Sequence, residues 1–186
     1  VWKEEDTELL EKSLKKIVKG RLVTEQDKAI YSLLRPGRLL ELTQYYTVYD
    51  KNVKKIARYQ QYFSIIHTLE RIKTFDDENR RKGGLIWHTQ GSGKSLTMVM
   101  LSRAIMTEKT IRNPKVVVVT DRVNLDKQIK NTFVHTGMSP VRASTGLHLT
   151  RVLKENKANI ITTVINKFDA VLNQNSEVYN DNNIFV

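Results

Sequence analysis

Residues 88–95 read His-Thr-Gln-Gly-Ser-Gly-Lys-Ser. They stand between a short apolar run, residues 85–87, and a run of helix-forming residues, 96–106. A glycine-rich turn between a strand and a helix predicts a phosphate-binding loop. Its exposed N–H groups, the positive end of the helix and one lysine converge on the phosphates. The alternative is a glycine-rich turn of the same shape that binds nothing.

The loop departs from the usual pattern at one position, where His88 stands in place of the first glycine. Gly91 can adopt a left-handed conformation without the steric cost of a Cβ, and Gly93 lets the backbone approach a phosphate closely. We expect Lys94 to contact the β- and γ-phosphates and the Ser95 hydroxyl to help hold Mg²⁺. The predicted ligands are therefore a nucleoside triphosphate and Mg²⁺, and the other predicted contacts are Thr89, Gln90, Ser92 and Leu96.

Composition narrows the class of protein. The 186 residues are 40% hydrophobic, enough for one domain with a core and part of another. Cysteine is absent, which excludes disulfides and thiolate metal sites. No apolar run approaches the length of a membrane span and the first residues show no signal-peptide pattern, so we expect an intracellular protein without a membrane partner. The net charge of +11 favours polyanionic partners, although many proteins of this charge bind no nucleic acid.

The first part of the chain, about residues 1–82, is rich in charge and in helix formers. Asp6 or Thr7 is expected to cap the first helix, and the spacing of Thr24 and Asp27 is typical of a capping box. The predicted helices run to about residue 19 and over 25–34, 39–46 and 54–75. Residues 76–84 predict a solvated loop, with a basic DNA-facing patch as the alternative.

From Gly84 the pattern changes to alternating strands and helices. The β-branched run over 116–119 is typical of a strand that is buried on both faces. The alternation predicts an α/β fold with a mostly parallel sheet and right-handed crossovers. The predicted strands are 85–87, 115–120, 141–144, 159–163 and 183–186, and the predicted helices are 94–107, 124–133, 146–155 and 165–172.

Four segments together resemble the restriction (R, motor) subunit of type I restriction–modification enzymes. The segment Ile86–Thr97 resembles the family's first helicase motif, in which an aromatic residue and His commonly precede the loop. Val116–Arg122, with Leu125, Asp126 and Gln128, resembles the next motif. Ile160–Thr163, with Lys167 and Phe168, resembles a later one, and Ala57–Phe63 resembles the upstream segment in which a glutamine recognises adenine. The resemblance covers roughly residues 54–186 and is weaker over 1–53.

The resemblance implies a superfamily 2 helicase-like motor, in which two RecA-like domains clamp ATP and move double-stranded DNA. Residues 1–53 would form a helical linker between nuclease and motor regions, 54–82 a helix carrying the adenine-recognition segment, and 83–186 the first RecA-like domain. That P-loop domain would be incomplete, since the family's Asp-Glu pair follows a strand like 184–186, and the fragment itself would not turn ATP over. The implied partners are double-stranded DNA and the modification (methyltransferase) and specificity subunits, in a bacterial cytoplasm.

The same resemblance assigns an adenine-binding role to Gln61, with Arg58 three residues before it. Gln60 is the competing candidate, and both glutamines could instead lie on the polar face of a helix. An amide suits the task because it presents a donor and an acceptor to the adenine edge. Tyr59 would stack on the base or pack in the core.

Thr120, Arg122 and Thr163 end two predicted strands, at an edge that touches the DNA backbone in the family. A hydroxyl and a guanidinium suit phosphate oxygens and carry no sequence information. The alternatives are an ion pair from Arg122 to Asp121 or Asp126, and a strand-end cap for Thr163. Trp87 is expected to pack beneath the loop, while His67, His135 and His148 lack metal-site spacing.

Three rival functions stay open. One is another superfamily 2 enzyme, such as a type III restriction subunit or a chromatin-type remodeller. A small-molecule kinase shares the loop but would need a lid and an arginine cluster that the sequence does not reveal. An interaction module with a vestigial loop would bind its partner without nucleotide.

Overall fold

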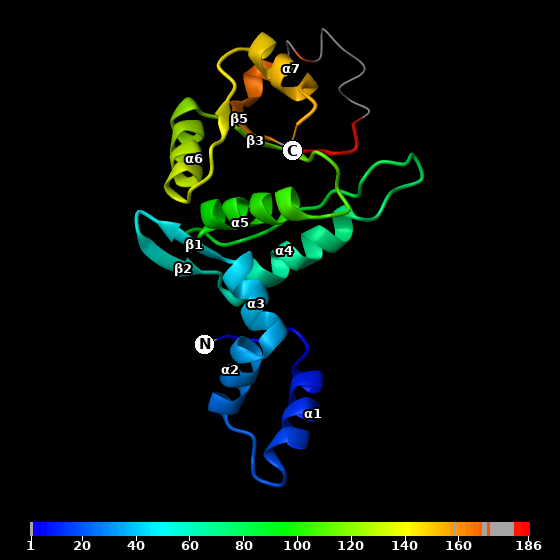
Figure 1. The fold of residues 1–186 in the computed structure, drawn as a ribbon, viewed down its shortest axis with the longest axis vertical. Helices are drawn as coiled ribbons and strands as arrows, with labels where there is room; N and C mark the ends of the chain where they lie inside the picture. The colour runs from blue at the N-terminus through cyan, green and yellow to red at the C-terminus, as the bar shows by residue number, and fades with distance from the viewer. Residues whose placement is uncertain (1, 158, 169–170, 172–180) are drawn as a thin grey trace.

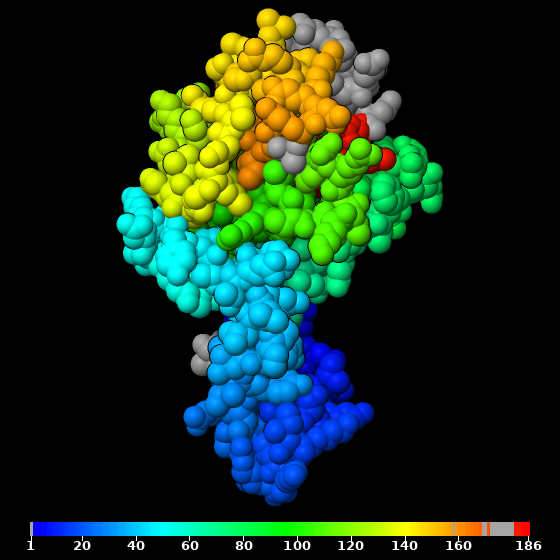
Figure 2. Space-filling view, in the orientation of Figure 1, coloured from blue at the N-terminus to red at the C-terminus, as the bar shows by residue number. Residues whose placement is uncertain are grey.

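The computed structural model of the protein describes residues 2–157, 159–168, 171 and 181–186. Three N-terminal helices stand out as a narrower extension below an α/β body (Figures 1 and 2). In the body, α5 lies between α4 and the sheet, so the residues that follow the phosphate loop pack in the centre of the molecule.

The N-terminal extension consists of α1 (Thr7–Val18), α2 (Glu25–Leu34) and α3 (Pro36–Gln44). The Asp6 carboxylate accepts a hydrogen bond from the Leu9 N–H at 2.8 Å, which caps α1 as predicted. The Thr24 N–H donates to the Asp27 carboxylate at 2.9 Å, and the Asp27 N–H donates to the Thr24 hydroxyl at 3.3 Å. The predicted capping box is therefore confirmed, and α2 has the predicted bounds.

A hairpin that the sequence analysis missed follows the extension. Strands β1 (Thr47–Asp50) and β2 (Val53–Ile56) pair antiparallel, and the two turn residues, Lys51 and Asn52, have φ of 50° and 65°. Two left-handed residues are the requirement of a tight type I′ hairpin turn. The predicted helix over 39–46 is wrong at both ends, because Pro36 at the first turn of α3 starts it earlier and it ends at Gln44.

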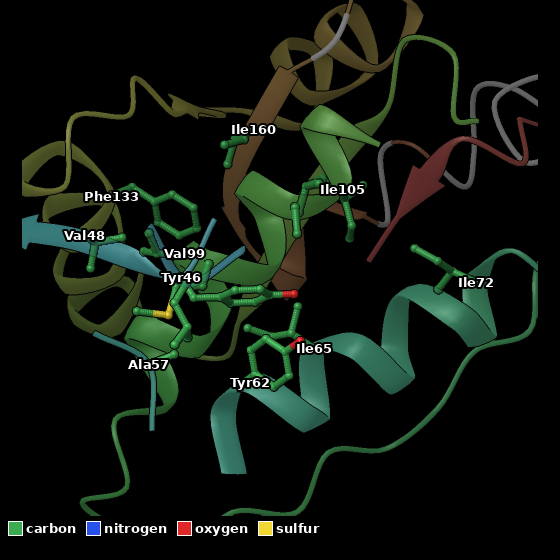
Figure 3. Close-up of a cluster of buried hydrophobic side chains, with 14 of the residues drawn as sticks. Tyr46, Val48, Ala57, Tyr62, Ile65, Ile72, Val99, Ile105, Phe133 and Ile160 are labelled. Atoms are coloured by element: carbon green, nitrogen blue, oxygen red, sulfur yellow. The ribbon is translucent and has the colours of Figure 1, made fainter. Parts of the chain in front are cut away.

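The predicted long helix over 54–75 is also wrong, since its first residues belong to β2 and α4 spans only Tyr59–Ile72. Tertiary packing overrides helix propensity here. Val48 in β1 is 2% exposed and joins the hydrophobic cluster that contains Phe133, so strand formation buries apolar surface (Figure 3).

The body is a parallel sheet with strand order β4-β5-β3-β6, which confirms the predicted fold class. The central strands β3 and β5 pair in register, with Val117 opposite Ile161. Val116 and Ile160 join the cluster shared with α4, α5 and α6, whereas Val117 and Ile161 pack with α7 on the other face. The elements are α5 (Lys94–Thr107), β3 (Lys115–Thr120), α6 (Val123–His135), β4 (Val141–Arg142), α7 (Gly146–Lys154), β5 (Asn159–Val164) and β6 (Ile184–Phe185).

The predicted helix over 165–172 starts as a 3₁₀ turn, η1 (Ile165–Lys167), and part of it lies outside the described residues.

The predicted strand over Leu85–Trp87 is wrong. These residues are irregular, and the Leu85 and Trp87 side chains are 85% and 86% exposed, so Trp87 does not pack beneath the loop. They line a groove of about 800 Å³ beside β6. Because β6 has only two residues, pairing with it would form few ladder hydrogen bonds, and Gly83 and Gly84 add no strand propensity.

Candidate nucleotide-binding site

The predicted phosphate loop leads directly into α5. Gly91 and Gly93 have φ of 76° and 88°, so both adopt the left-handed conformation expected from the sequence. Gly93 is the N-cap of α5, and its carbonyl accepts hydrogen bonds from the N–H groups of Leu96 and Thr97 at 2.9 and 3.1 Å. The first amides of α5 therefore emerge from the end of the loop, where the helix dipole is positive.

Lys94 is the first residue of α5, and its side chain turns back over the loop. Its Nζ donates to the backbone carbonyl of Thr89 at 2.9 Å and to that of His88 at 3.4 Å. The ammonium group is exposed and lies beside the positive end of the helix. This combination creates a concentration of positive charge and N–H donors that suits a phosphate group.

The hydroxyl groups of the loop complete the donor set. Ser92 Oγ is buried and has no hydrogen-bond partner among the described residues, and Ser95, one residue after the lysine, is half-buried. A buried hydroxyl without a hydrogen bond costs free energy. A phosphate oxygen would accept a hydrogen bond from the Ser92 hydroxyl. The residues of the loop therefore suit a bound polyphosphate. Thr89 and Gln90 are exposed, and Leu96 packs against the main hydrophobic cluster.

Gln61 supports the loop from α4. It is 5% exposed; its Oε1 accepts the Arg58 N–H at 2.8 Å. Its Nε2 donates to the Gly93 carbonyl and to the Thr97 hydroxyl, each at 3.2 Å. Both ends of the amide are thus bonded to the protein, whereas Gln60 is exposed. The adenine role of Gln61 stays a prediction, and it requires at least one of these bonds to be exchanged.

The sequence analysis missed Thr97, whose hydroxyl joins Gln61 to the loop. Its position was the available signal. It lies four residues after Gly93, so it starts the second turn of α5 on the loop's side.

The carboxyl ends of β3 and β5 bring the three predicted DNA contacts into one region. Thr120 is 7% exposed, and its hydroxyl donates to the Arg122 carbonyl at 3.3 Å. The Arg122 side chain is 81% exposed and pairs with Asp121 at 3.2 Å, one of the two alternatives considered. Thr163 is fully buried, and its hydroxyl has no hydrogen-bond partner in the described part of the chain. Arg122 is therefore the residue of the three that can reach a phosphate directly, and all three contacts stay predictions.

Asp126 does not pair with Arg122. It is fully buried and instead accepts a hydrogen bond from Arg142 of β4 at 2.5 Å. Its second oxygen, Oδ1, has no partner among the described residues. The pair ties α6 to the sheet and is structural.

His67 and His135 lie on the surface, whereas His88 and His148 are half-buried. His67 contacts Glu5 at 3.0 Å, and His135 lies 4.0 Å from Asp50. In the part of the chain that the structure describes, no three His, Asp or Glu side chains are grouped to hold a metal ion. A metal here would depend on Ser95 and on oxygens of its ligand. In the same part of the chain, no helix has the length and apolar character needed to cross a membrane.

Comparison with known proteins gives the family. Residues 60–186 match the model of the SWI2/SNF2 ATPase family, and the chain belongs to that family. It is also similar to endonuclease subunits of type I restriction enzymes. It is 31% identical over 154 residues to the putative MjaIXP endonuclease subunit of Methanocaldococcus jannaschii, covering 81% of this chain and 15% of that protein.

The HindI endonuclease subunit of Haemophilus influenzae is 31% identical over 155 residues, 77% of this chain and 15% of the relative. The putative MjaVIIP endonuclease subunit of M. jannaschii is 35% identical over 124 residues, 62% of this chain and 11% of the relative. The chain therefore spans about one seventh or less of the length of these relatives, and the similarity to type I restriction subunits matches the resemblance of its motifs.

Proposed function

We propose that this chain is the ATP-binding part of the motor subunit of a type I restriction endonuclease. The whole protein would couple ATP hydrolysis to translocation along double-stranded DNA and to cleavage. One observation carries the proposal. A loop with two left-handed glycines leads into α5, which starts with Lys94, and the buried Ser92 Oγ of this loop has no hydrogen-bond partner among the described residues. The similarity to type I endonuclease subunits supports it.

Different residues of the loop would bind the phosphates of ATP and the Mg²⁺ ion. The amides at the start of α5 and the Ser92 hydroxyl would hold phosphate oxygens, and Ser95 would supply one ligand to Mg²⁺. To bind the γ-phosphate, Lys94 would release the carbonyls of His88 and Thr89. Bound Mg²⁺ would neutralise charge that develops on the phosphates. Gln61 would position Gly93 and, by exchanging a bond, contact adenine.

The remaining parts of the proposal concern the assembly. Thr120, Arg122 and Thr163 would contact the DNA backbone, and the modification and specificity subunits would be partners within one complex. We propose the division into a linker over 1–53, an adenine-recognition segment over 54–82 and a motor domain over 83–186. One hydrophobic cluster contains Leu42, Tyr62 and Val99, so the three parts share a core.

The alternative is another superfamily 2 translocase, such as a type III restriction subunit or a remodeller. The match of residues 60–186 to the SWI2/SNF2 ATPase family is compatible with it, because that family description does not specify restriction. Both functions require the same nucleotide site, so the nucleotide experiment tests both. Restriction of unmodified DNA by the full-length protein with its partner subunits excludes a remodeller, and a requirement for a separate specificity subunit separates the type I from the type III function.

The test is calorimetric titration of the full-length protein with Mg-ATP. Lys94→Ala removes the ammonium at the loop and should abolish the binding heat. Lys15→Ala on α1 is the matched control, because it removes an exposed lysine outside the loop. Equal heats from Lys94→Ala and the unmodified protein would overturn the assignment of the loop.

A further inference from the structure

A polar groove of about 460 Å³ lies between the β1–β2 hairpin and α6. The hairpin projects from the body on the side that carries α6 (Figures 1 and 2). The function proposed above rests on the phosphate loop and on the ends of β3 and β5. It assigns no role to this groove. Its walls hold no apolar side chain, which sets it apart from the groove beside β6.

One wall is a polar stripe along α6. It consists of residues spaced three or four apart, which places them on one face of a helix: Asn124, Lys127, Gln128, Asn131, Thr132 and His135. The opposite face holds the buried residues Asp126, Ile129 and Phe133. Asp126 is the one carboxylate of α6 and it is engaged by Arg142, so the exposed stripe has none. Every side chain of the stripe can donate a hydrogen bond.

The other wall is the hairpin. Its one carboxylate, that of Asp50, forms an ion pair. The Asp50 carboxylate pairs with Lys55 at 2.5 Å, and this hydrogen bond holds the pKa of Asp50 below its usual range. By contrast, Lys51 and Lys127 form no ion pair with any described residue, on either side of the groove. The groove is therefore lined by hydrogen-bond donors and by two ammonium groups without an ion pair, and its one carboxylate, Asp50, is paired with Lys55 and also attracted by the charge of Lys51.

The turn holds Lys51 at the tip of the hairpin. Its φ of 50° is uncommon for a residue with a Cβ, and Asn52 follows at 65°. A two-residue turn with both residues left-handed is tight and leaves the tip little freedom. Lys51 is thus presented from a short, fixed element rather than from a long loop.

We propose that this groove binds the phosphodiester backbone of double-stranded DNA. The proposal rests on the proposed function and adds a surface to it, because α6 starts directly after Arg122 and the groove continues from that edge. From Asn124 to His135 the stripe extends about 16 Å at ~1.5 Å per residue. A stripe of this length can lie along more than one phosphate of a single strand, because the charges of each strand are closely spaced. Contacts of this kind are insensitive to base sequence.

The experiment measures binding of the full-length protein to a short labelled duplex of random sequence over a series of salt concentrations. Lys51→Asn removes the charge and keeps a residue that tolerates the left-handed conformation. Lys127→Gln removes the charge and keeps helix propensity. Each lysine that neutralises a phosphate contributes about 0.9 to the slope of log affinity against log salt.

Lys51→Asn and Lys127→Gln should therefore each lower the slope of log affinity against log salt by about 0.9, and the double variant should lower it by about 1.8. A fourfold rise in salt should then weaken each variant roughly threefold to fourfold less than the unmodified protein. Lys12→Gln on α1 is the control, an exposed lysine on an element far from the hairpin, and should keep the original slope (Figure 1).

The outcomes separate this proposal from the one on which it rests. If the unmodified protein fails to bind duplex, its proposed function as a DNA motor fails. If the unmodified protein binds duplex with a steep salt dependence and both groove variants match Lys12→Gln, the groove proposal alone is overturned. Circular dichroism of each variant confirms that the fold is intact.

Discussion

Gly93 faces Gln61 so closely that a Cβ added to the glycine would lie 2.9 Å from the Gln61 Nε2. Real Cβ atoms essentially never approach another heavy atom this closely. The neighbouring Gly91 has the same left-handed backbone, yet a Cβ there would meet nothing within 4 Å. The two glycines of the loop are therefore required for different reasons, one by its conformation alone and the other also by its neighbour.

Gly93→Ala should lower the melting temperature and the ATP affinity more than Gly91→Ala does. Both variants carry the strain of a left-handed alanine, about 1–2 kcal/mol, but only Gly93→Ala also displaces Gln61. Thermal unfolding and titration with Mg-ATP measure the two effects. Adding Gln61→Ala to each variant should narrow the difference between them. Equal melting temperatures for the two single variants would show that the Gln61 contact does not constrain the loop.

Gln61→Ala should destabilise the protein by about 1–3 kcal/mol, because the Arg58 N–H loses its acceptor and the buried Thr97 hydroxyl loses the N–H that donates to it, keeping only its own bond to the Gly93 carbonyl. Gln60→Ala is the matched control; it removes an exposed amide and should stay within about 0.5 kcal/mol. Denaturant unfolding gives both values. If Gln61 also contacts adenine, its variant should lose preference for ATP over GTP. A preference unchanged in Gln61→Ala and lost in Gln60→Ala would transfer that role to Gln60.

Arg142→Ala should destabilise the protein by about 3–5 kcal/mol, since it leaves the fully buried Asp126 carboxylate without its partner. Arg122→Ala breaks the exposed pair with Asp121 and should change stability by about 0–1 kcal/mol. Urea unfolding of the two variants side by side checks the contrast. A small effect of Arg142→Ala would show that the Arg142 pair does not stabilise the buried Asp126.

Elements with strong local signals were predicted with their true bounds. The helix over 25–34 has a capping box, the helix over 94–107 follows Gly93, and the strand over 115–120 is a β-branched run. The hairpin over 47–56 escaped prediction because it depends on burial of Val48 by residues distant in sequence. The predicted strand over 85–87 did not form although its residues favour a strand. Three strand-forming residues need a partner edge, and β6 presents only two residues.

In the candidate site, too, local features were predicted from the sequence and long-range contacts were not. The positive φ of Gly91 and Gly93 follows from the loop's own sequence, and the structure confirms it. The contacts of Gln61 with Gly93 and Thr97 join positions 32 and 36 residues apart, so no local pattern could indicate them. Thr163 lies two residues after Ile161, on the face of β5 that packs with α7, so its burial also depends on elements beyond its own strand.

Tyr62 makes the stability of the fold sensitive to alkaline pH. Burial raises the pKa of Tyr62 to about 12, and the hydrogen bond that its hydroxyl donates to Glu41 adds to the shift, while Arg38 opposes it. In the unfolded chain the value is about 10. Between these two values the unfolded chain has lost the proton that the folded chain keeps. Stability is therefore fully present below pH 10 and falls as the pH rises, by up to about 1.4 kcal/mol per pH unit.

Tyr62→Phe should remove the contribution of Tyr62 to the loss of stability at alkaline pH. The free energy of unfolding should then decline less steeply between pH 10 and pH 12. The variant also loses the bond to Glu41 and is expected to be less stable at neutral pH, so the slope is the informative quantity. Burial raises the pKa of Tyr46 as well, which leaves part of the slope in the variant. Tyr49→Phe is the control, because that side chain is 57% exposed and should leave the slope unchanged. Parallel curves for Tyr62→Phe and the unmodified protein would show that Tyr62 ionises as readily in the fold as outside it.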